Sequence, residues 1–221
     1  MEISRHALLL VGSPKSTGSA SESLGTYLIA KLESGGFVTQ TVHIQTLVRS
    51  PQSQEALVEL VKASDILVLA FPLYIDSLPA AVISALELIA QRRQSQIPLK
   101  EQALLAIVNN GFPEAGQNST AIAICRQFCH ETGIQWVGGL SLGGGGIISG
   151  RPLVKAGFML RNTRKALDMA ASDLIANKPV RQEAANLMAK PIVPKWLYAS
   201  IGNRSWKKAA KAFGSQDKLY G

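Results

Sequence analysis

The sequence of 221 residues has only two cysteines, and neither belongs to a Cys-x-x-Cys pair. Small domains held together by disulfides need several cysteines, so that class is excluded and a reducing compartment is expected. The three histidines, His6, His43 and His130, are scattered among different segments. Without a cluster of Cys and His ligands, we expect no metal site.

Long hydrophobic runs are also missing. The longest runs, such as Ala7–Val11 and Ile66–Phe71, have the length of a strand, whereas a membrane-spanning helix needs about 20 apolar residues. The first residues carry no signal-peptide pattern. Because 47% of the residues are hydrophobic and 17% are charged, the chain can bury a core. We therefore expect a cytoplasmic globular protein with no integral membrane association.

Acidic residues are scarce near the C-terminus. Residues 1–150 contain 9 Lys and Arg against 11 Asp and Glu, whereas residues 151–221 contain 14 against 4. A basic segment can attract nucleic acid, phospholipid or a phosphorylated cofactor. More often it is the solvated face of terminal helices. We favour that interpretation and expect no nucleic-acid partner.

Strand-like and helix-like segments alternate through the first two thirds of the chain. The predicted strands are Ala7–Val11, Phe37–Ile44, Ile66–Phe71, Ala103–Val108 and Gln135–Leu142. The predicted helices between them are Ser21–Glu33, Gln54–Ala63, Ala80–Arg93 and a segment that ends near Glu131. Right-handed crossovers then favour an α/β fold with a doubly wound, five-stranded parallel sheet and helices on both faces. Such sheets bind ligands beyond the carboxyl ends of their strands.

Residues after 150 are predicted to be helical. We expect one long helix over Leu153–Ala176 and a final amphipathic helix. The final helix has Trp206, Ala209, Ala210 and Phe213 on one side and Lys207, Lys208 and Lys211 on the other. It could dock on the body, on a partner or on a membrane surface, and docking on the body is favoured. We assign residues 1–177 to the main domain and residues 178–221 to a basic helical extension packed on it.

The loop after the first strand, Gly12–Ser21, is rich in hydroxyl residues and glycine. The N-terminus of the helix that follows offers free N–H groups and a partial positive charge, both of which suit a phosphate. The loop matches neither the P-loop nor the G-x-G-x-x-G pattern. A cluster of helix N-caps is the alternative explanation. Its place after the first strand of an α/β sheet favours phosphate binding.

The loop after the third strand, Pro72–Pro79, is apolar and aromatic where a wet sheet edge is expected. A flat hydrophobic ligand would explain Leu73, Tyr74 and Ile75. Ordinary loop packing or a dimer contact is the alternative.

Two further loops follow the fourth and fifth strands. In Asn109–Gln117, the side chains of Asn109, Asn110 and Glu114 are candidates for hydrogen bonds to a bound ring, although Asn110-Gly111 is also a turn signal. The run Gly143–Gly146, which includes the candidate Gly144, lets the backbone approach a ligand. A flexible turn is the alternative for this run.

Signals for hydrolytic or thiol chemistry are weak. No Gly-x-Ser-x-Gly motif is present, so a hydrolase triad is poorly supported. Cys125 and Cys129 are four residues apart on one predicted helix, which is the usual pattern of small buried residues. We expect no catalytic side chain.

Three segments, VGSPKSTGSASESLGTYL, FPLYIDSLPA and NNGFPEAGQN, together resemble the NADPH-dependent FMN reductase family, which has the flavodoxin-like fold. The resemblance covers most of the chain and extends to residues 206–214. It implies FMN-phosphate contacts for five residues of the first loop: Ser13, Lys15, Ser19, Ala20 and Ser21. It also implies contacts with the isoalloxazine ring for Pro72, Leu73, Tyr74 and Ile75. The site candidates after the fourth and fifth strands are Asn109, Asn110, Gly111, Glu114 and Gly144.

Departures from the family are few. Ala20 stands where a hydroxyl residue is common, which weakens one phosphate contact. The compact cysteine motif of relatives that carry an iron–sulfur cluster is absent. Relatives are often dimers with the flavin near the subunit contact, so the resemblance implies a homodimer.

We therefore expect an FMN-dependent NAD(P)H oxidoreductase that passes electrons to a small acceptor: a quinone, a nitro or azo compound, or free flavin. The cofactor supplies this chemistry and the protein positions it. One alternative is a flavodoxin-type electron carrier without its own NAD(P)H turnover, but such carriers are typically acidic and the sequence pI here is 9.7. A flavin-free binding protein is the other alternative, and Ala20 is its only support.

Overall fold

The computed structural model describes residues 4–15, 17–94, 100–148 and 150–215. Ser16 of the first loop and residues 216–221 of the expected extension lie outside these ranges. Five parallel strands form one sheet in the order β2-β1-β3-β4-β5. The strands are β1 (His6–Val11), β2 (Val38–His43), β3 (Ile66–Pro72), β4 (Ala103–Asn109) and β5 (Gln135–Leu142). The expected doubly wound α/β sheet, with the flavodoxin-like strand order, is confirmed.

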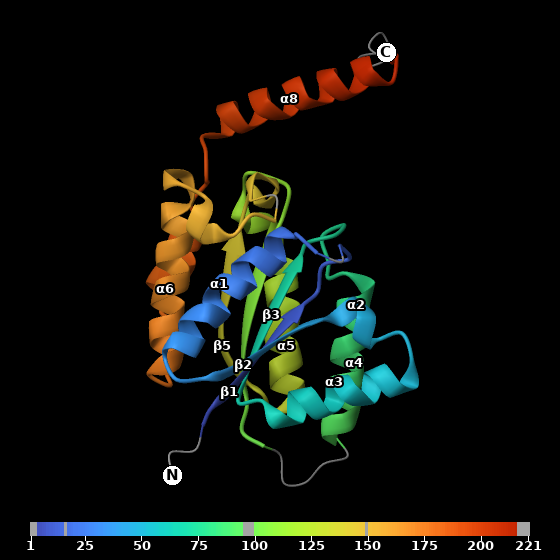
Figure 1. Ribbon diagram of the computed structural model, residues 1–221, viewed down its shortest axis with the longest axis vertical. Coiled ribbons are helices and arrows are strands. Elements are labelled where there is room, and N and C mark those ends of the chain that lie inside the picture. The colour runs from blue at the N-terminus through green and yellow to red at the C-terminus, as the bar shows by residue number, and fades with distance from the viewer. Residues whose placement is uncertain (1–3, 16, 95–99, 149, 216–221) are drawn as a thin grey trace.

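Helices cover both faces of the sheet (Figure 1). On one face lie α1 (Ala20–Ser34), α6 (Arg161–Ile175) and α7 (Gln182–Met188). On the other face lie α3 (Pro51–Ala63), α4 (Ala80–Gln94) and α5 (Ser119–Thr132). Two short or terminal helices complete the set: α2 (Ile44–Leu47) and α8 (Lys195–Ala212).

The apolar strands explain why the sheet is covered on both sides. Successive side chains of a strand point to opposite faces. In β1, Leu9 packs into the core beneath α1 and α6, whereas Leu8 and Leu10 pack into the core beneath α3, α4 and α5. A strand with both faces buried has no place for polar residues, which accounts for the uninterrupted apolar runs. The edge strand β2 is mostly exposed or half-buried, as its alternating sequence predicts.

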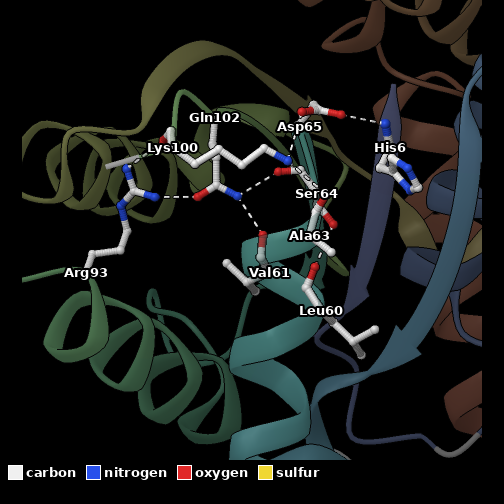
Figure 2. Close-up of polar contacts among 9 residues, drawn as sticks. All are labelled: His6, Leu60, Val61, Ala63, Ser64, Asp65, Arg93, Lys100 and Gln102. Atoms are coloured by element: carbon white, nitrogen blue, oxygen red, sulfur yellow. Dashed lines mark hydrogen bonds and ion pairs between the residues drawn. The ribbon is translucent and has the colours of Figure 1, made fainter. Parts of the chain in front are cut away.

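A network of polar side chains lies at the amino end of the sheet (Figure 2). Gln102 donates to the carbonyl oxygens of Val61 (2.6 Å) and Ser64 (2.8 Å), and its own oxygen accepts from Arg93. Arg93, only 7% exposed, also donates to the carbonyl of Thr132 at 2.9 Å. These carbonyls lie at the C-terminal ends of α3 and α5, so Gln102 and Arg93 serve as caps for both helices.

Lysine and arginine side chains continue this network. Lys100 donates to the carbonyl of Ala63 (2.8 Å) and pairs with Asp65 (2.9 Å). Burial alone would raise the pKa of Asp65, but a hydrogen bond from the N–H of His6 and the Lys100 ammonium together hold that pKa below its usual value. Arg5 caps α6 in the same way, through the carbonyls of Leu174 and Ile175.

The helix expected over Leu153–Ala176 is shorter than predicted. Two 3₁₀ turns, Leu153–Lys155 and Phe158–Leu160, precede α6, which begins at Arg161. Gly157 separates the turns with a φ of 62°, a left-handed conformation that ends a helix and that glycine adopts without strain. The apolar spacing in this segment resembles a helix, but the turn at Gly157 breaks it. The short helix α2 was also not expected.

The C-terminal extension behaves as two different parts. α7 packs against α6 and β5. In contrast, α8 projects from the body at the end where the arrowheads of β3 and β5 lie (Figure 1). Its Trp196 and Trp206 are 73% and 71% exposed, so the expected docking of this helix on the body is not what the structure shows.

Candidate functional site

A cavity of about 380 Å³ opens at the carboxyl end of the sheet. It lies at the carboxyl ends of β1 and β3, where the strand order reverses, and extends to the loops after β4 and β5. In doubly wound sheets this is the usual place of ligand binding. The lining residues come from all four loops: Ser13, Lys15, Gly18, Ser19, Ala20, Ser21, Pro72, Leu73, Tyr74, Asn109, Asn110, Gly111, Gly145 and Gly146.

The N-terminus of α1 forms one wall of the cavity. Ser19 is its N-cap, and its hydroxyl accepts the N–H of Glu22 at 3.0 Å. The Glu22 carboxylate reaches back to the N–H groups of Gly18 (2.7 Å) and Ser19 (3.4 Å), which completes a capping box. Ala20 and Ser21 occupy the first two helical positions, whose N–H groups have no partner inside a helix. These two N–H groups and the helix dipole suit an anion.

Polar side chains of the same loop support this wall. Ser13, 4% exposed, accepts the backbone N–H of Lys15 at 3.3 Å. Lys15 is exposed and lines the cavity, so its ammonium group is available near the helix N-terminus. The Lys15 ammonium group, the dipole of α1 and the first N–H groups of that helix would therefore all attract a bound anion.

The loop after β3 forms a tight turn. Tyr74 and Ser77 exchange two backbone hydrogen bonds of 3.0 Å, and the two residues between them, Ile75 and Asp76, have φ values of 47° and 58°. Positive φ at both central positions is the type I′ geometry. A β-branched residue in this conformation is strained, and such strain persists where the surrounding structure requires it. The turn places Pro72, Leu73 and Tyr74 along the cavity and turns Ile75, 99% exposed, away from it.

The two asparagines after β4 hold the loops together. Asn109, 5% exposed, donates to the hydroxyl of Ser21 (2.7 Å) and to the carbonyl of Phe71 (3.2 Å), which links β4 to α1 and β3. Asn110 donates to the carbonyl of Glu114 and to the side chain of Asn118, and accepts the N–H of Phe112. Its side chain therefore shapes its own loop, which leaves it less free to bond a ligand than the sequence suggested.

Backbone from beyond β5 closes the cavity. Gly145 and Gly146 lie along it, and Gly150 lies directly against the backbone of Gly18. A Cβ atom on Gly150 would be 1.9 Å from the carbonyl oxygen of Gly18, and the φ of Gly150 is 70°. Only glycine fits both conditions, so the last of the four loops is fixed against the first.

The structure brings together most of the residues that the sequence predicted. Eleven line the cavity, but Ile75, Glu114 and Gly144 do not. Ile75 is turned outward by the type I′ turn, and Glu114 contributes a carbonyl to Asn110. In the glycine run, Gly145 and Gly146 occupy the position expected of Gly144. Sequence analysis missed Gly18 and Glu22, although Ser19-x-x-Glu22 is a capping-box pattern that could have revealed the helix start.

Thiol and metal chemistry find no support in the described parts of the chain. Burial raises the pKa of both Cys125 and Cys129 to about 12, so neither thiol is a nucleophile near neutral pH. In the ranges that the structure describes, no three His, Cys, Asp or Glu side chains are grouped so that they could hold a metal ion. None of the described helices is long and apolar enough to cross a bilayer.

Comparison with known families gives one match. Residues 5–147 match the family described as "Flavodoxin-like fold". This range contains all the predicted site residues. No curated protein sequence matches the chain.

Several solved structures are similar in fold. An NADH:FMN oxidoreductase, solved in its apo form, is 17% identical with a TM-score of 0.58, and the match covers 86% of this chain and 97% of that one. An NAD(P)H:quinone oxidoreductase from Methanothermobacter marburgensis is 14% identical with a TM-score of 0.56, covering 84% and 96%. An FMN-dependent NADH-azoreductase from Bacillus anthracis, solved with FMN, is 13% identical with a TM-score of 0.53, covering 77% and 99%. At these identities the likeness concerns the fold.

Proposed function

The chain belongs to the flavodoxin-like fold family, and we propose that it is an FMN-dependent NAD(P)H oxidoreductase. Its acceptor would be a small molecule: a quinone, a nitro or azo compound, or free flavin. The family contains NAD(P)H-dependent flavin and quinone reductases, and the three solved structures named above carry such activities in their names. We also propose a homodimer, as the resemblance of the sequence implies.

The observation that carries this proposal is the composition of the cavity. The lining includes the N-terminus of α1 at Ala20 and Ser21, together with Lys15. It also has Pro72, Leu73 and Tyr74 against a backbone wall of glycine. A phosphate at the helix N-terminus and a flat ring against the apolar residues describe a phosphorylated flavin. The volume, about 380 Å³, lies in the range of small-molecule sites.

The residues present therefore fit FMN. Its phosphate would be held by the N–H groups at the start of α1, by Ser19 and by Lys15, while Tyr74 and Leu73 would contact the ring. Bound FMN would supply the redox chemistry, taking hydride from NAD(P)H and passing electrons to the acceptor.

The protein's part in this chemistry is to position and stabilise. Backbone N–H groups of the loops after β3 and β4 would stabilise negative charge as it develops on the ring. No acid or base is required, and among the described residues the cavity lining includes no Asp, Glu or His side chain. Lys15 is the cation among these described lining residues, and it would face the phosphate.

Absorbance and turnover separate this function from its alternatives. The purified protein should bind FMN far more tightly than riboflavin, because riboflavin lacks the phosphate that the helix N-terminus binds. It should oxidise NADPH under air. An electron carrier of the same fold would bind FMN without this turnover, and a flavin-free protein would bind neither flavin. Equal affinity for FMN and riboflavin would contradict the phosphate site.

Two substitutions test the helix N-terminus and the apolar residues of the cavity. Ser19→Ala should weaken FMN binding by roughly 1.5–3 kcal/mol through a lost charge-assisted hydrogen bond, and leave riboflavin binding unchanged. Tyr74→Ala should weaken FMN and riboflavin alike, by roughly 0.5–1.5 kcal/mol beyond the lost contact area. Titration of both flavins into both variants measures these effects. If both variants bind and turn over like the parent, the site is placed wrongly.

A further inference from the structure

Among the residues that the structure describes, the most exposed large apolar side chains are concentrated in α8 and in the loops beyond the strand ends. Trp196, Trp206 and Phe213 are 73%, 71% and 85% exposed. The described residues of α8 pack extensively against no other element. Their main link to the body is a 2.5 Å hydrogen bond from the Tyr198 hydroxyl to the carbonyl of Gly111. Large apolar side chains exposed together on one element indicate an interaction site.

The charge of α8 is of one sign. Residues 191–215 contain five basic residues and no Asp or Glu; the basic residues are Lys195, Arg204, Lys207, Lys208 and Lys211. Arg204, Lys207, Lys208 and Lys211 are exposed. At 100° per residue, these four lie on one side of the helix, and Trp206 and Phe213 lie on the opposite side. Exposed tryptophan and phenylalanine with a lysine-rich polar face are typical of a helix that lies in a membrane interface.

We propose that α8 binds the surface of a bilayer that contains anionic phospholipid. Trp206 and Phe213 enter the boundary between headgroups and acyl chains, while the lysines extend to the negatively charged headgroups. The helix lies in the interface and does not span the bilayer, which agrees with its length and charge. This inference does not depend on the proposed flavin chemistry.

Charge favours a lipid surface over a second copy of the chain. Two α8 helices repel each other, because all the charged side chains of each helix are positive. The rest of the chain offers little compensation, since residues 1–150 have a net charge of only −2, from 9 basic and 11 acidic residues. An anionic bilayer presents a continuous negative surface to all the lysines at once.

Further apolar side chains lie on the same side of the protein. Val154 and Phe158 are both 72% exposed and Met159 is 52% exposed, and basic residues adjoin them in the sequence. They follow the carboxyl end of β5, which is the end of the sheet from which α8 projects (Figure 1). A bilayer bound by α8 would thus face the end of the protein that holds the cavity.

The test is sedimentation of the full-length protein with vesicles. We expect it to sediment with vesicles of phosphatidylcholine and phosphatidylglycerol and to stay in solution with phosphatidylcholine alone. Lys207→Gln, Lys208→Gln and Lys211→Gln combined should reduce binding at least about tenfold, and added salt should have the same effect. Trp206→Ala with Phe213→Ala should reduce it similarly without any change in charge.

A matched control places the same loss of charge on the body: Arg49→Gln, Arg126→Gln and Lys178→Gln, all at exposed positions. This variant should bind the anionic vesicles almost as the parent does, and circular dichroism should show every variant folded. The proposal is overturned if the parent stays in solution with anionic vesicles, or if the control loses as much binding as the α8 variants. It is also overturned if the parent is a dimer that ignores vesicles and that Trp206→Ala with Phe213→Ala dissociates, because a second copy then covers the helix.

Discussion

The two ends of the sheet are built from opposite principles. At the amino end, Arg93, Lys100 and Gln102 donate hydrogen bonds to the C-terminal ends of the protein's own helices (Figure 2), beside a polar hollow of about 620 Å³. At the carboxyl end, glycine and serine loops surround a cavity of about 380 Å³, and the turn at Ile75 is strained. Side chains at the first end bind the protein's own carbonyl groups, whereas loops at the second end line the candidate site.

The direction of the helices explains this difference. In a parallel sheet the helices run antiparallel to the strands, so their C-terminal ends, with partial negative charge, gather at the amino end. There the protein supplies its own cations and amides, such as Arg93 for α5 and Lys100 for α3. At the carboxyl end the N-terminus of α1, with its partial positive charge, lies at the candidate site, where an anion would be favoured.

The largest loss of stability is expected from a substitution in the polar network at the amino end. Arg93→Leu removes the donor to the Gln102 oxygen and to the Thr132 carbonyl, and both acceptors stay buried without a partner. The free energy of unfolding should fall by about 3 kcal/mol, as measured by urea denaturation. FMN affinity of the folded protein should not change, because Arg93 lies at the far end of the sheet from the cavity. Arg126→Leu, at an exposed position of α5, is the control and should stay within about 0.5 kcal/mol of the parent.

A substitution at the carboxyl end should lower the free energy of unfolding less than Arg93→Leu does, but it should reduce FMN affinity more. Gly150→Ala pushes the chain away from Gly18 and should reduce FMN affinity at least about tenfold, in addition to about 2 kcal/mol of strain. Gly157→Ala is the matched control, since Gly157 also has positive φ but no neighbour within 4 Å of an added Cβ. It should cost about 1–3 kcal/mol of backbone strain and leave FMN binding intact. Equal FMN affinities in both variants would show that the contact with Gly18 does not shape the site.

The ion pair between Asp173 and Arg181 should make the free energy of unfolding depend on pH. Hydrogen bonds from the Arg181 side chain hold the pKa of Asp173 below its usual value, although burial opposes this shift. The carboxylate therefore stabilises the fold above the unfolded-state pKa of about 4, and this contribution is lost as the pH falls through the lower folded-state value. Asp173→Asn should be less stable than the parent from pH 5 to 8, and the difference should shrink below about pH 4. Urea denaturation across this range measures it, and a constant difference at every pH would contradict the assignment.

The smallest effect, a modest change in FMN affinity, is expected from removing the negative charge of Glu22 beside the candidate site. Glu22 occupies the N–H groups of Gly18 and Ser19 beside the proposed phosphate position. Glu22→Gln keeps an oxygen for the capping box but removes the negative charge, so FMN affinity should rise about two- to threefold at low salt. The gain should vanish at high salt, where charges are screened. Glu33→Gln, near the other end of α1, should change nothing in the same titration.

At both ends of the sheet the sequence predicts some features and misses others. The five strands and the place of the cavity follow from apolar runs and loop composition, because burial and backbone chemistry act locally. The pairing of Asn109 with Ser21, or of Gln102 with the end of α3, joins residues far apart in the chain and leaves no local pattern. The outward turn of Ile75 and the break at Gly157 were not predicted for a different reason: each depends on positive backbone φ angles and not on periodicity.

The contact between Gly150 and Gly18 has a consequence for how the protein is made. On the ribosome, the chain emerges from the N-terminus, so the first loop leaves long before residue 150 is synthesised. Until then the wall against Gly18 is missing, and the nascent domain has no complete cavity. A cofactor that binds only the finished cavity would stabilise only fully synthesised, folded chains, and so would favour them over truncated products in quality control.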